Sequence, residues 1–148
     1  MSEAELNLER IYVRDASFES PHAPEVFREQ WQPNIQLEIN TRANGLGEER
    51  YEVVLTATVS AKSDVGKTLL IVEVQQAGIF RVRGLAEDGL RRLLATQCPT
   101  ILFPYIRETV DSLMARGGFP PLHLAPVNFD AMFAEALKRR GAPPEVQH

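Results

Sequence analysis

One run of the chain, TLLIVEVQQAGIFRV at positions 68–82, constrains the fold more than any other. It is rich in Leu, Ile and Val, and apolar and polar side chains alternate along it, which is typical of a β-strand with two different faces. Such a strand predicts an antiparallel sheet that is covered on one side and open to water on the other. Because successive side chains point to opposite faces, the expected covered side carries Val72, Val74 and Gln76, and the expected open side carries Ile71, Glu73 and Gln75.

Three upstream segments alternate in the same way, and each predicts a further strand of this sheet. The run RANGLGEE at positions 42–49 predicts a hairpin turn between the second and the third of them. In the first segment, the alternation places Tyr12 on the same face as Ala16 and Phe18. The three expected strands occupy residues 11–19, 34–41 and 51–60.

Two segments near the start of the chain lack this alternation. Residues 1–9 are polar and acidic, and we expect them to form a disordered leader. Residues 20–33, SPHAPEVFREQWQP, contain too much proline for a strand and predict a long loop that crosses between strands, called here the crossing loop. Loops of this length in compact domains are usually functional.

After Gly84 the hydrophobic period changes and predicts helices that cover the sheet. Residues 86–95 predict a short helix, and Pro99 is well placed at the first position of a longer one that reaches about Arg116, with a kink at Pro104. Gly117 and Gly118 predict its end. The fold class is therefore α+β, with a four-stranded antiparallel sheet and helices on one face.

The C-terminal part begins with an extended segment fixed by proline, FPPLHLAPV at positions 119–127, called here the strap. Asn128 is a good cap for a last helix, which carries a single apolar stripe. Residues 141–148 are expected to be a flexible tail, so that the predicted domain spans residues 10–140.

The expected open face collects carboxylates from four strands. A solvated face that keeps the protein in solution is one interpretation, since antiparallel sheets commonly expose a polar side. The other is an electrostatic docking site for a partner rich in Lys and Arg. Charge favours a basic partner, because residues 1–80 carry 13 acids and 7 bases. The carboxylates are Asp15, Glu19, Glu38, Glu52 and Glu73.

Enzyme chemistry is hard to build from these residues. Positions 61–68, AKSDVGKT, match a loosened phosphate-loop pattern, but a strand follows where a phosphate loop needs a helix. The three histidines have no spacing typical of metal ligands, and Cys98 is expected to be a buried structural thiol. We therefore predict no catalytic residue, no metal and no cofactor. One cysteine and the absence of an apolar leader favour a cytoplasmic protein.

Apolar side chains exceed what the cover of four strands requires. They lie in the crossing loop, in the strap and on the last helix. One interpretation is that they form the cover of the core, and the other is that they line a groove in which rings and Met side chains accept many apolar sequences. Open strand edges further predict a symmetric oligomer, with the kinked helix at its centre. The surplus apolar side chains are Phe27, Trp31, Phe119, Leu122, Leu124, Phe129, Met132 and Phe133.

Several blocks of this sequence resemble the bacterial protein-export chaperone family SecB. They are IYVRDASFESPHAP, YEVVL, VEVQQAGIF, CPTILFPYIRE and RGGFPPLHLAPVNFDAMF. The resemblance extends from about residue 11 to residue 137. It implies an ATP-independent holdase that keeps secretory precursors unfolded and delivers them to the SecA motor ATPase. It also implies a homotetramer built as a dimer of dimers.

The resemblance also implies roles for individual residues. The family's acidic SecA-docking residues correspond to Asp15, Glu19 and Glu73, beside Ile71. Its assembly-sensitive strand positions correspond to Val72, Val74 and Gln76. Its peptide groove involves the crossing loop and the last helix, and the residues proposed for it are the six groove candidates Phe27, Trp31, Phe119, Leu122, Phe129 and Met132. Two alternatives stay open: a SecB-like chaperone dedicated to an antitoxin of a toxin-antitoxin system, and a small cytosolic enzyme.

Overall fold

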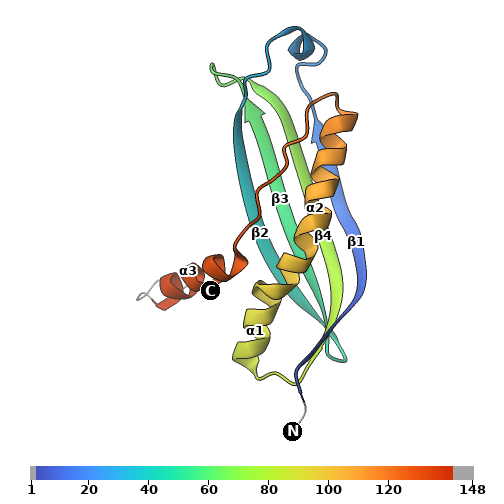
Figure 1. The fold of residues 1–148 in the computed structure, drawn as a ribbon, viewed down its shortest axis with the longest axis vertical. Helices are drawn as coiled ribbons and strands as arrows, with labels where there is room; N and C mark the ends of the chain where they lie inside the picture. Colours follow the sequence, from blue (N-terminus) through green and yellow to red (C-terminus); the bar gives the residue numbers. More distant parts are fainter. Residues whose placement is uncertain (1–2, 142–148) are drawn as a thin grey trace.

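A computed structural model of the chain describes residues 3–141 and contains one four-stranded antiparallel sheet with helices on one face (Figure 1). The strand order is β1-β4-β3-β2, so that β1 and β2 form the two edges. This confirms the predicted α+β class and the four strands. The strands are β1 (Glu5–Glu19), β2 (Asn34–Gly47), β3 (Arg50–Lys62) and β4 (Thr68–Arg83).

The helices pack on what we call the covered face. Helix α2 (Gln97–Arg116) runs along the sheet, and the strap returns beside it towards α3 (Phe129–Gly141) (Figure 1). Helix α1 (Glu87–Ala95) precedes α2, and a short 3-10 turn, η1 (Glu25–Arg28), lies in the crossing loop. The crossing loop connects the two edge strands around one end of the sheet.

The core lies between β3, β4 and the inner side of α2. One side of each central strand is fully buried there, because alternate side chains of β3 and β4 meet the helix. The side chains that α2 contributes recur at helical spacing, which gives the helix one continuous apolar side. Those with no exposed surface include Leu55, Val59, Val72, Val74, Phe80, Leu102, Ile106, Val110 and Met114.

Strand β1 starts earlier than the alternation predicted. Glu5 pairs with Arg83 and Leu8 pairs with Phe80, so residues 5–9 are part of the sheet and the expectation of a leader over them is wrong. Polar side chains at an edge strand need no burial, because one of its sides stays in water. The composition of residues 1–9 therefore did not distinguish an edge strand from a disordered segment. Residues 142–148 of the expected tail lie outside the part of the chain that the structure describes.

A β-bulge in β1 corrects the predicted face of Tyr12. Val13 pairs with Gln76 and Asp15 pairs with Gln75, so Arg14 is an extra residue in β1. An extra residue in one strand shifts the alternation by one position. Tyr12 therefore pairs with Ala77 and lies on the open face, whereas Phe18 pairs with Val72 and lies on the covered face as predicted.

The hairpin between β2 and β3 is tighter than predicted. Both strands continue into the run that was expected to be a turn, and only Glu48 and Glu49 lie between them. These two residues have φ of 56° and 65°, the left-handed conformation that a two-residue hairpin turn requires. The glycines of residues 42–49 correctly indicated that a hairpin lies here. Pairing between β2 and β3 determined that the turn itself has only two residues.

Candidate functional site

The four predicted docking residues lie together on the open face, at one end of β1 and β4. Glu19 pairs with Ile71, Ser17 pairs with Glu73, and Asp15 pairs with Gln75. Asp15 and Glu19 are exposed, while Ile71 and Glu73 are half-buried. The hydroxyl group of Thr58 on β3 donates a hydrogen bond of 3.2 Å to Oε2 of Glu73, which orients this carboxylate.

A fourth carboxylate extends this surface to the other edge of the sheet. Glu38 on β2 pairs with Thr58, and Thr58 pairs with Glu73, so that the two acids lie in one row across the strands. Beside this row, a shallow polar hollow of about 450 Å³ is lined by Gln36, Leu37, Glu38, Thr58 and Ser60. We call Asp15, Glu19, Glu38 and Glu73 the acidic patch. Within the described residues, none of the four forms an ion pair.

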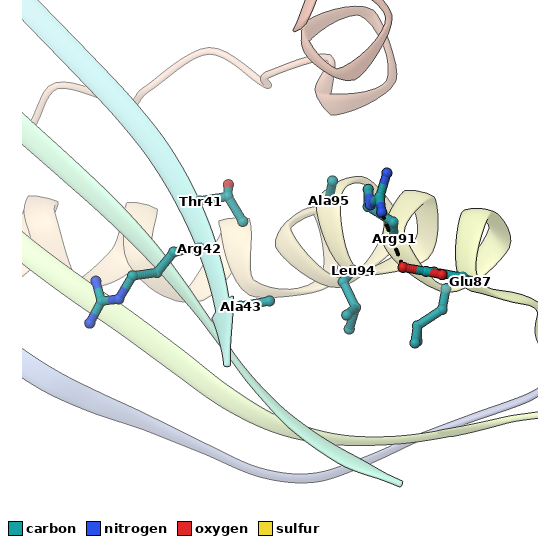
Figure 2. Close-up of a pocket in the computed structure, with 8 residues that line it drawn as sticks. Thr41, Arg42, Ala43, Glu87, Arg91, Leu94 and Ala95 are labelled. Carbon is teal, nitrogen blue, oxygen red and sulfur yellow. Dashed lines mark hydrogen bonds and ion pairs between the residues drawn. The ribbon is translucent and has the colours of Figure 1, made fainter. Parts of the chain in front are cut away.

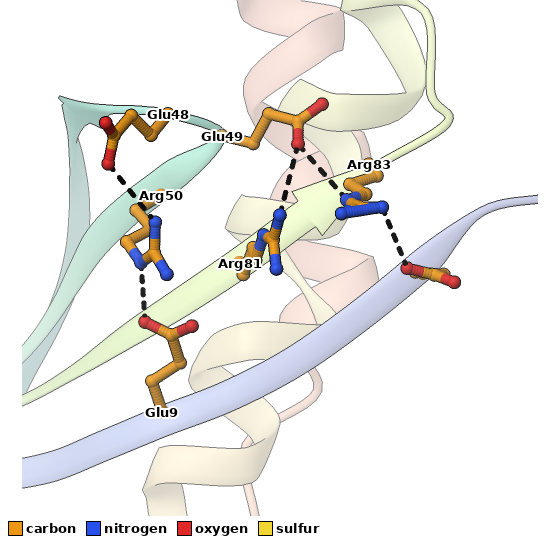
Figure 3. A network of polar contacts seen from close by, with 7 residues as sticks. Glu9, Glu48, Glu49, Arg50, Arg81 and Arg83 are labelled. Atoms are coloured by element: carbon orange, nitrogen blue, oxygen red, sulfur yellow. Dashed lines mark hydrogen bonds and ion pairs between the residues drawn. The ribbon is translucent and has the colours of Figure 1, made fainter.

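At the opposite end of the open face, acids and arginines neutralise one another (Figure 3). Arg50 contacts Glu9 at 2.8 Å, and Arg83 contacts Glu49 at 3.1 Å. Arg81 also approaches Glu49, at 3.9 Å. Among the described residues, the open face is thus divided into an end whose carboxylates are paired with arginine and an end whose carboxylates form no ion pair.

Glu52, the fifth predicted open-face carboxylate, is not solvated as we expected. It is only 7% exposed and lies beneath side chains from β1 and β2. The hydroxyl group of Tyr12 donates to its Oε2 at 2.6 Å, and Arg14 donates to both oxygens at 2.9 and 2.7 Å. The amide of Asn44 donates to Oε1 at 3.3 Å. The bulge in β1 explains this burial, because it places Tyr12 and Arg14 on the open face with Glu52 instead of on the face that carries Phe18.

These contacts shift the pKa values of two groups. Burial raises the pKa of Glu52, but the hydrogen bonds from Tyr12, Arg14 and Asn44 outweigh it and bring the pKa below its usual value. Burial and the hydrogen bond to Glu52 raise the pKa of Tyr12 to about 12. The sequence alone did not indicate this cluster, since no pattern in β1 marked the extra residue.

The lowered pKa of Glu52 predicts an acid-dependent loss of stability. A group whose pKa is lower in the folded state contributes stability above its unfolded pKa, and that contribution disappears as pH falls through the folded pKa. We expect Glu52→Gln to reduce the free energy of unfolding by about 2 kcal/mol at neutral pH. The difference between wild type and variant should shrink below about pH 4.5. Urea unfolding at a series of pH values measures this, and a pH-independent difference would contradict it.

The three strand positions predicted to affect assembly are buried on the covered face. Val72 and Val74 have no exposed surface, and Gln76 is 3% exposed. The amide nitrogen of Gln76 donates to the backbone oxygen of Tyr12 at 3.2 Å, while its oxygen accepts from the Thr109 hydroxyl at 3.1 Å. Gln76 therefore joins β4 to the edge strand and to α2. Its predicted role in assembly stays a prediction.

Three of the six groove candidates form one aromatic cluster around the ring of Phe119. The centroid of this ring lies 5.2 Å from that of Phe27 and 5.1 Å from that of Trp31. Phe18 on β1, which we had not singled out as a groove residue, joins the cluster at 6.1 Å. Phe119 is buried, while Phe27 keeps 49% of its surface exposed. We call these four residues the aromatic cluster.

The other three candidates lie farther along the strap and on α3. Phe129 is buried against Phe103 of α2, with ring centroids 6.4 Å apart, while Met132 is 41% exposed. Leu122 lies on the strap between the two groups and packs against the core. Asp111 of α2 fixes the strap there by accepting the backbone N–H of Leu122 at 2.9 Å. The six candidates are thus arranged as two groups joined by the strap.

A separate cleft of about 490 Å³ separates the edge of β2 from α1 (Figure 2). Ala43, Leu90 and Leu94 give it apolar walls. Arg42 and Arg91 lie at its rim, and Arg91 contacts Glu87 at 3.4 Å. The cleft has no convergent set of titratable side chains that would indicate catalysis.

Other expectations about chemistry concern single residues. Cys98 is fully buried, as predicted, and burial raises the pKa of its thiol to about 12. Thr68 opens a strand, so the phosphate-loop-like run does not lead into a helix. No group of three or more potential metal ligands occurs among residues 3–141. No helix within this range has the length and apolar character needed to cross a membrane.

Comparison with known proteins agrees with the resemblance. The family model SecB, described as preprotein translocase subunit SecB, matches residues 1–140. The protein-export protein SecB of Marinobacter nauticus is 54% identical over 134 residues, which cover 90% of this chain and 80% of that protein. The protein of the same name from Pseudomonas paraeruginosa is 49% identical over 142 residues, or 96% and 87% of the two chains.

A solved structure shares the fold. It is that of a Mycobacterium tuberculosis SecB-like chaperone in complex with a ChAD peptide from the HigA1 antitoxin. The TM-score is 0.70 with 20% identity, and the match covers 83% of this chain and 91% of that one.

Proposed function

Because this chain belongs to the SecB family, we propose that it is an ATP-independent chaperone of protein export. In this role it binds unfolded secretory precursors in the cytoplasm, keeps them competent for translocation and delivers them to the SecA motor ATPase. The observation that carries the proposal is the family match over residues 1–140, together with about 50% identity to two protein-export proteins.

The precursor would bind along the aromatic cluster, the strap and α3. Half-exposed Phe27 and exposed Met132 offer soft apolar surface at the two ends of this path. Ring faces and thioethers do not select one sequence, which suits a chaperone that takes many clients. Slowly folding precursors expose apolar segments for longer, so such a groove captures them by mass action while fast folders escape.

SecA would dock on the open face, on Asp15, Glu19 and Glu73 with Ile71 beside them. The support is electrostatic: the acidic patch has no ion pairs within the described residues, whereas the carboxylates at the opposite end are paired with arginine. Unpaired surface carboxylates attract a basic partner over several ångströms and accelerate its encounter. Docking at the patch leaves the groove on the other face of the sheet free for the client until transfer.

Assembly into a homotetramer, a dimer of dimers, would cover the exposed edge of β1. This edge strand is 15 residues long and presents Leu8 and Val13, which are 40% and 47% exposed. Unpaired edges of this length are prone to pair with another chain, and a second copy offers the same edge. Tyr105, 49% exposed on α2, would join the helix contacts at the centre. Several grooves in one assembly add avidity for a long unfolded chain.

An antitoxin-dedicated role is the alternative within the same family. The Mycobacterium tuberculosis chaperone was solved with an antitoxin peptide, but at 20% identity its likeness concerns the fold alone. The much closer relatives are export proteins. We therefore favour general export.

Native mass spectrometry with and without an unfolded precursor tests the proposal. We expect the mass of four 16.6 kDa chains, and a higher mass when the precursor is added. The folded, mature form of the same precursor is the matched control and should not bind. A monomer mass that stays unchanged with unfolded precursor would contradict both the assembly and the holdase activity.

A further inference from the structure

The guanidinium of Arg14 is a cation beside the acidic patch that could neutralise part of its charge. Arg14 is the extra residue of the β1 bulge and directly precedes Asp15 of the patch. Consecutive Cα atoms are about 3.8 Å apart, so the long Arg14 side chain has Asp15 within reach. An arginine that turned towards the patch would neutralise part of the charge offered to a basic partner.

In the structure, Arg14 turns away from the patch and towards Glu52. It crosses β4 to reach β3, and its Nη1 lies 2.9 and 2.7 Å from the two oxygens of Glu52. The side chain of Arg14 remains 46% exposed, whereas that of Glu52 is only 9% exposed. The arginine therefore has room to move, and the buried glutamate does not.

Glu52 is held in place from two further sides. Tyr12 donates to Oε2 at 2.6 Å from β1, and Asn44 donates to Oε1 at 3.3 Å from β2. These neutral donors fix the carboxylate without cancelling its charge, so that the full negative charge faces Arg14. Partial burial strengthens this attraction compared with a pair in water.

We propose that Glu52 is a positioning residue for docking: it binds the Arg14 guanidinium and so keeps this cation away from Asp15, leaving the acidic patch unneutralised for a basic partner. Glu52 itself does not touch the partner, because it is buried. This inference rests on the proposed docking of SecA at the patch, and it assigns a role to a carboxylate that the docking surface does not include.

The test uses the full chain in its native assembly and measures SecA binding at low salt. Glu52→Gln keeps the shape of the side chain and its contacts with Tyr12 and Asn44 but releases Arg14. We expect SecA affinity to fall about threefold to tenfold, with the loss diminishing as salt is raised. Arg14→Met, which keeps an apolar stem and removes the charge, should not weaken binding.

The double variant Glu52→Gln with Arg14→Met separates positioning from a merely structural role. If Glu52 acts through Arg14, the double variant recovers the affinity of Arg14→Met. If Glu52 only supports the fold, the double variant binds at least as weakly as Glu52→Gln, and the proposal is overturned. Wild-type affinity in Glu52→Gln also overturns it.

Glu73→Lys distinguishes failure of this inference from failure of the docking surface. Weak binding by Glu73→Lys with normal binding by Glu52→Gln rejects only the role of Glu52. Normal binding by both variants places SecA elsewhere and rejects both proposals. Native mass and circular dichroism of each variant verify that the assembly and fold are kept.

Discussion

The Phe119→Ala variant is expected to lose about 3 to 5 kcal/mol of its free energy of unfolding and to hold unfolded precursors poorly. Phe119 is 6% exposed and lies within 5.1 to 6.1 Å, centroid to centroid, of three other rings. Those rings come from β1 and from the crossing loop, so the removed ring leaves a cavity where three segments meet. The loop should then separate from the strap and open the groove.

Trp31 makes this result measurable, because it is the only tryptophan of the chain and lies in the cluster. We expect its fluorescence to shift to longer wavelength in Phe119→Ala as water reaches the indole. Urea unfolding gives the loss of stability, and aggregation of a denatured precursor gives the holding activity. Leu46→Ala, at an exposed position in the distant hairpin, is the surface control and should change the stability by less than about 0.5 kcal/mol.

Trp31→Ala separates client binding from stability of the fold. It removes a half-buried ring of the same cluster while Phe119 stays in place. Normal assembly with reduced suppression of aggregation is expected. Full suppression of aggregation by both Trp31→Ala and Phe119→Ala would show that clients bind elsewhere.

Reversing the charge at Glu73 is expected to weaken SecA binding about tenfold to a hundredfold, which corresponds to about 1.4 to 2.7 kcal/mol. Glu73 lies in one row across the strands with Thr58 and Glu38, and the hydroxyl group of Thr58 orients its carboxylate. A lysine there removes one attraction for a basic partner and adds one repulsion. Precursor holding should stay intact, because the proposed groove residues lie on the other face of the sheet.

Asp88→Lys is the matched control for this charge reversal. It changes the net charge by the same amount, but Asp88 is an exposed residue of α1 in the helical layer. Binding kinetics at two salt concentrations should show that Glu73→Lys mainly lowers the association rate, since unpaired surface charges act mostly on encounter. Equal affinities of Glu73→Lys and wild type would place the docking surface elsewhere.

Local pattern was sufficient for the central part of the sheet. In β4, the apolar residues on alternate positions can be buried together only if the strand keeps a single register. The alternation of the sequence was therefore enough to predict the faces of Val72 and Glu73. The same argument applied to β3. An edge strand such as β1 needs fewer buried apolar residues than a central strand. The polar residues 5–9 were therefore assigned to a leader, although they belong to β1.

The bulge at Arg14 shows what local pattern does not encode. The sequence IYVRDASFE alternates acceptably with or without an extra residue, so the side of Tyr12 depends on how β1 pairs with β4. That pairing places Tyr12 and Arg14 over Glu52, which is buried, whereas Asp15, Glu19 and Glu38 are exposed and Glu73 is half-buried. The sequence predicted the same solvated face for all five acids. In the structure, Glu52 is a buried structural acid and the other four form the acidic patch.

The two glycines after α2 have one role that the sequence predicts and another that only the tertiary structure shows. As a pair at the end of an apolar helix, Gly117 and Gly118 predicted where the helix stops. Only the tertiary structure shows that a side chain at Gly117 would collide with the ring of Phe18, and that the ring of Phe27 packs 3.0 Å from the position of a Cβ at Gly118. The glycines therefore also make room for the aromatic cluster.

By itself, the sequence determined the strand and helix order, the two faces of the central strands and the family, because alternation, helix signals and family motifs all lie within short stretches. The tertiary structure decided which carboxylates form no ion pair among the described residues and which rings meet. These outcomes depend on an inserted residue in an edge strand and on contacts between residues as far apart in the sequence as Phe18 and Phe119. The charge of the open face and the arrangement of the aromatic cluster are consequently properties of strand pairing and packing.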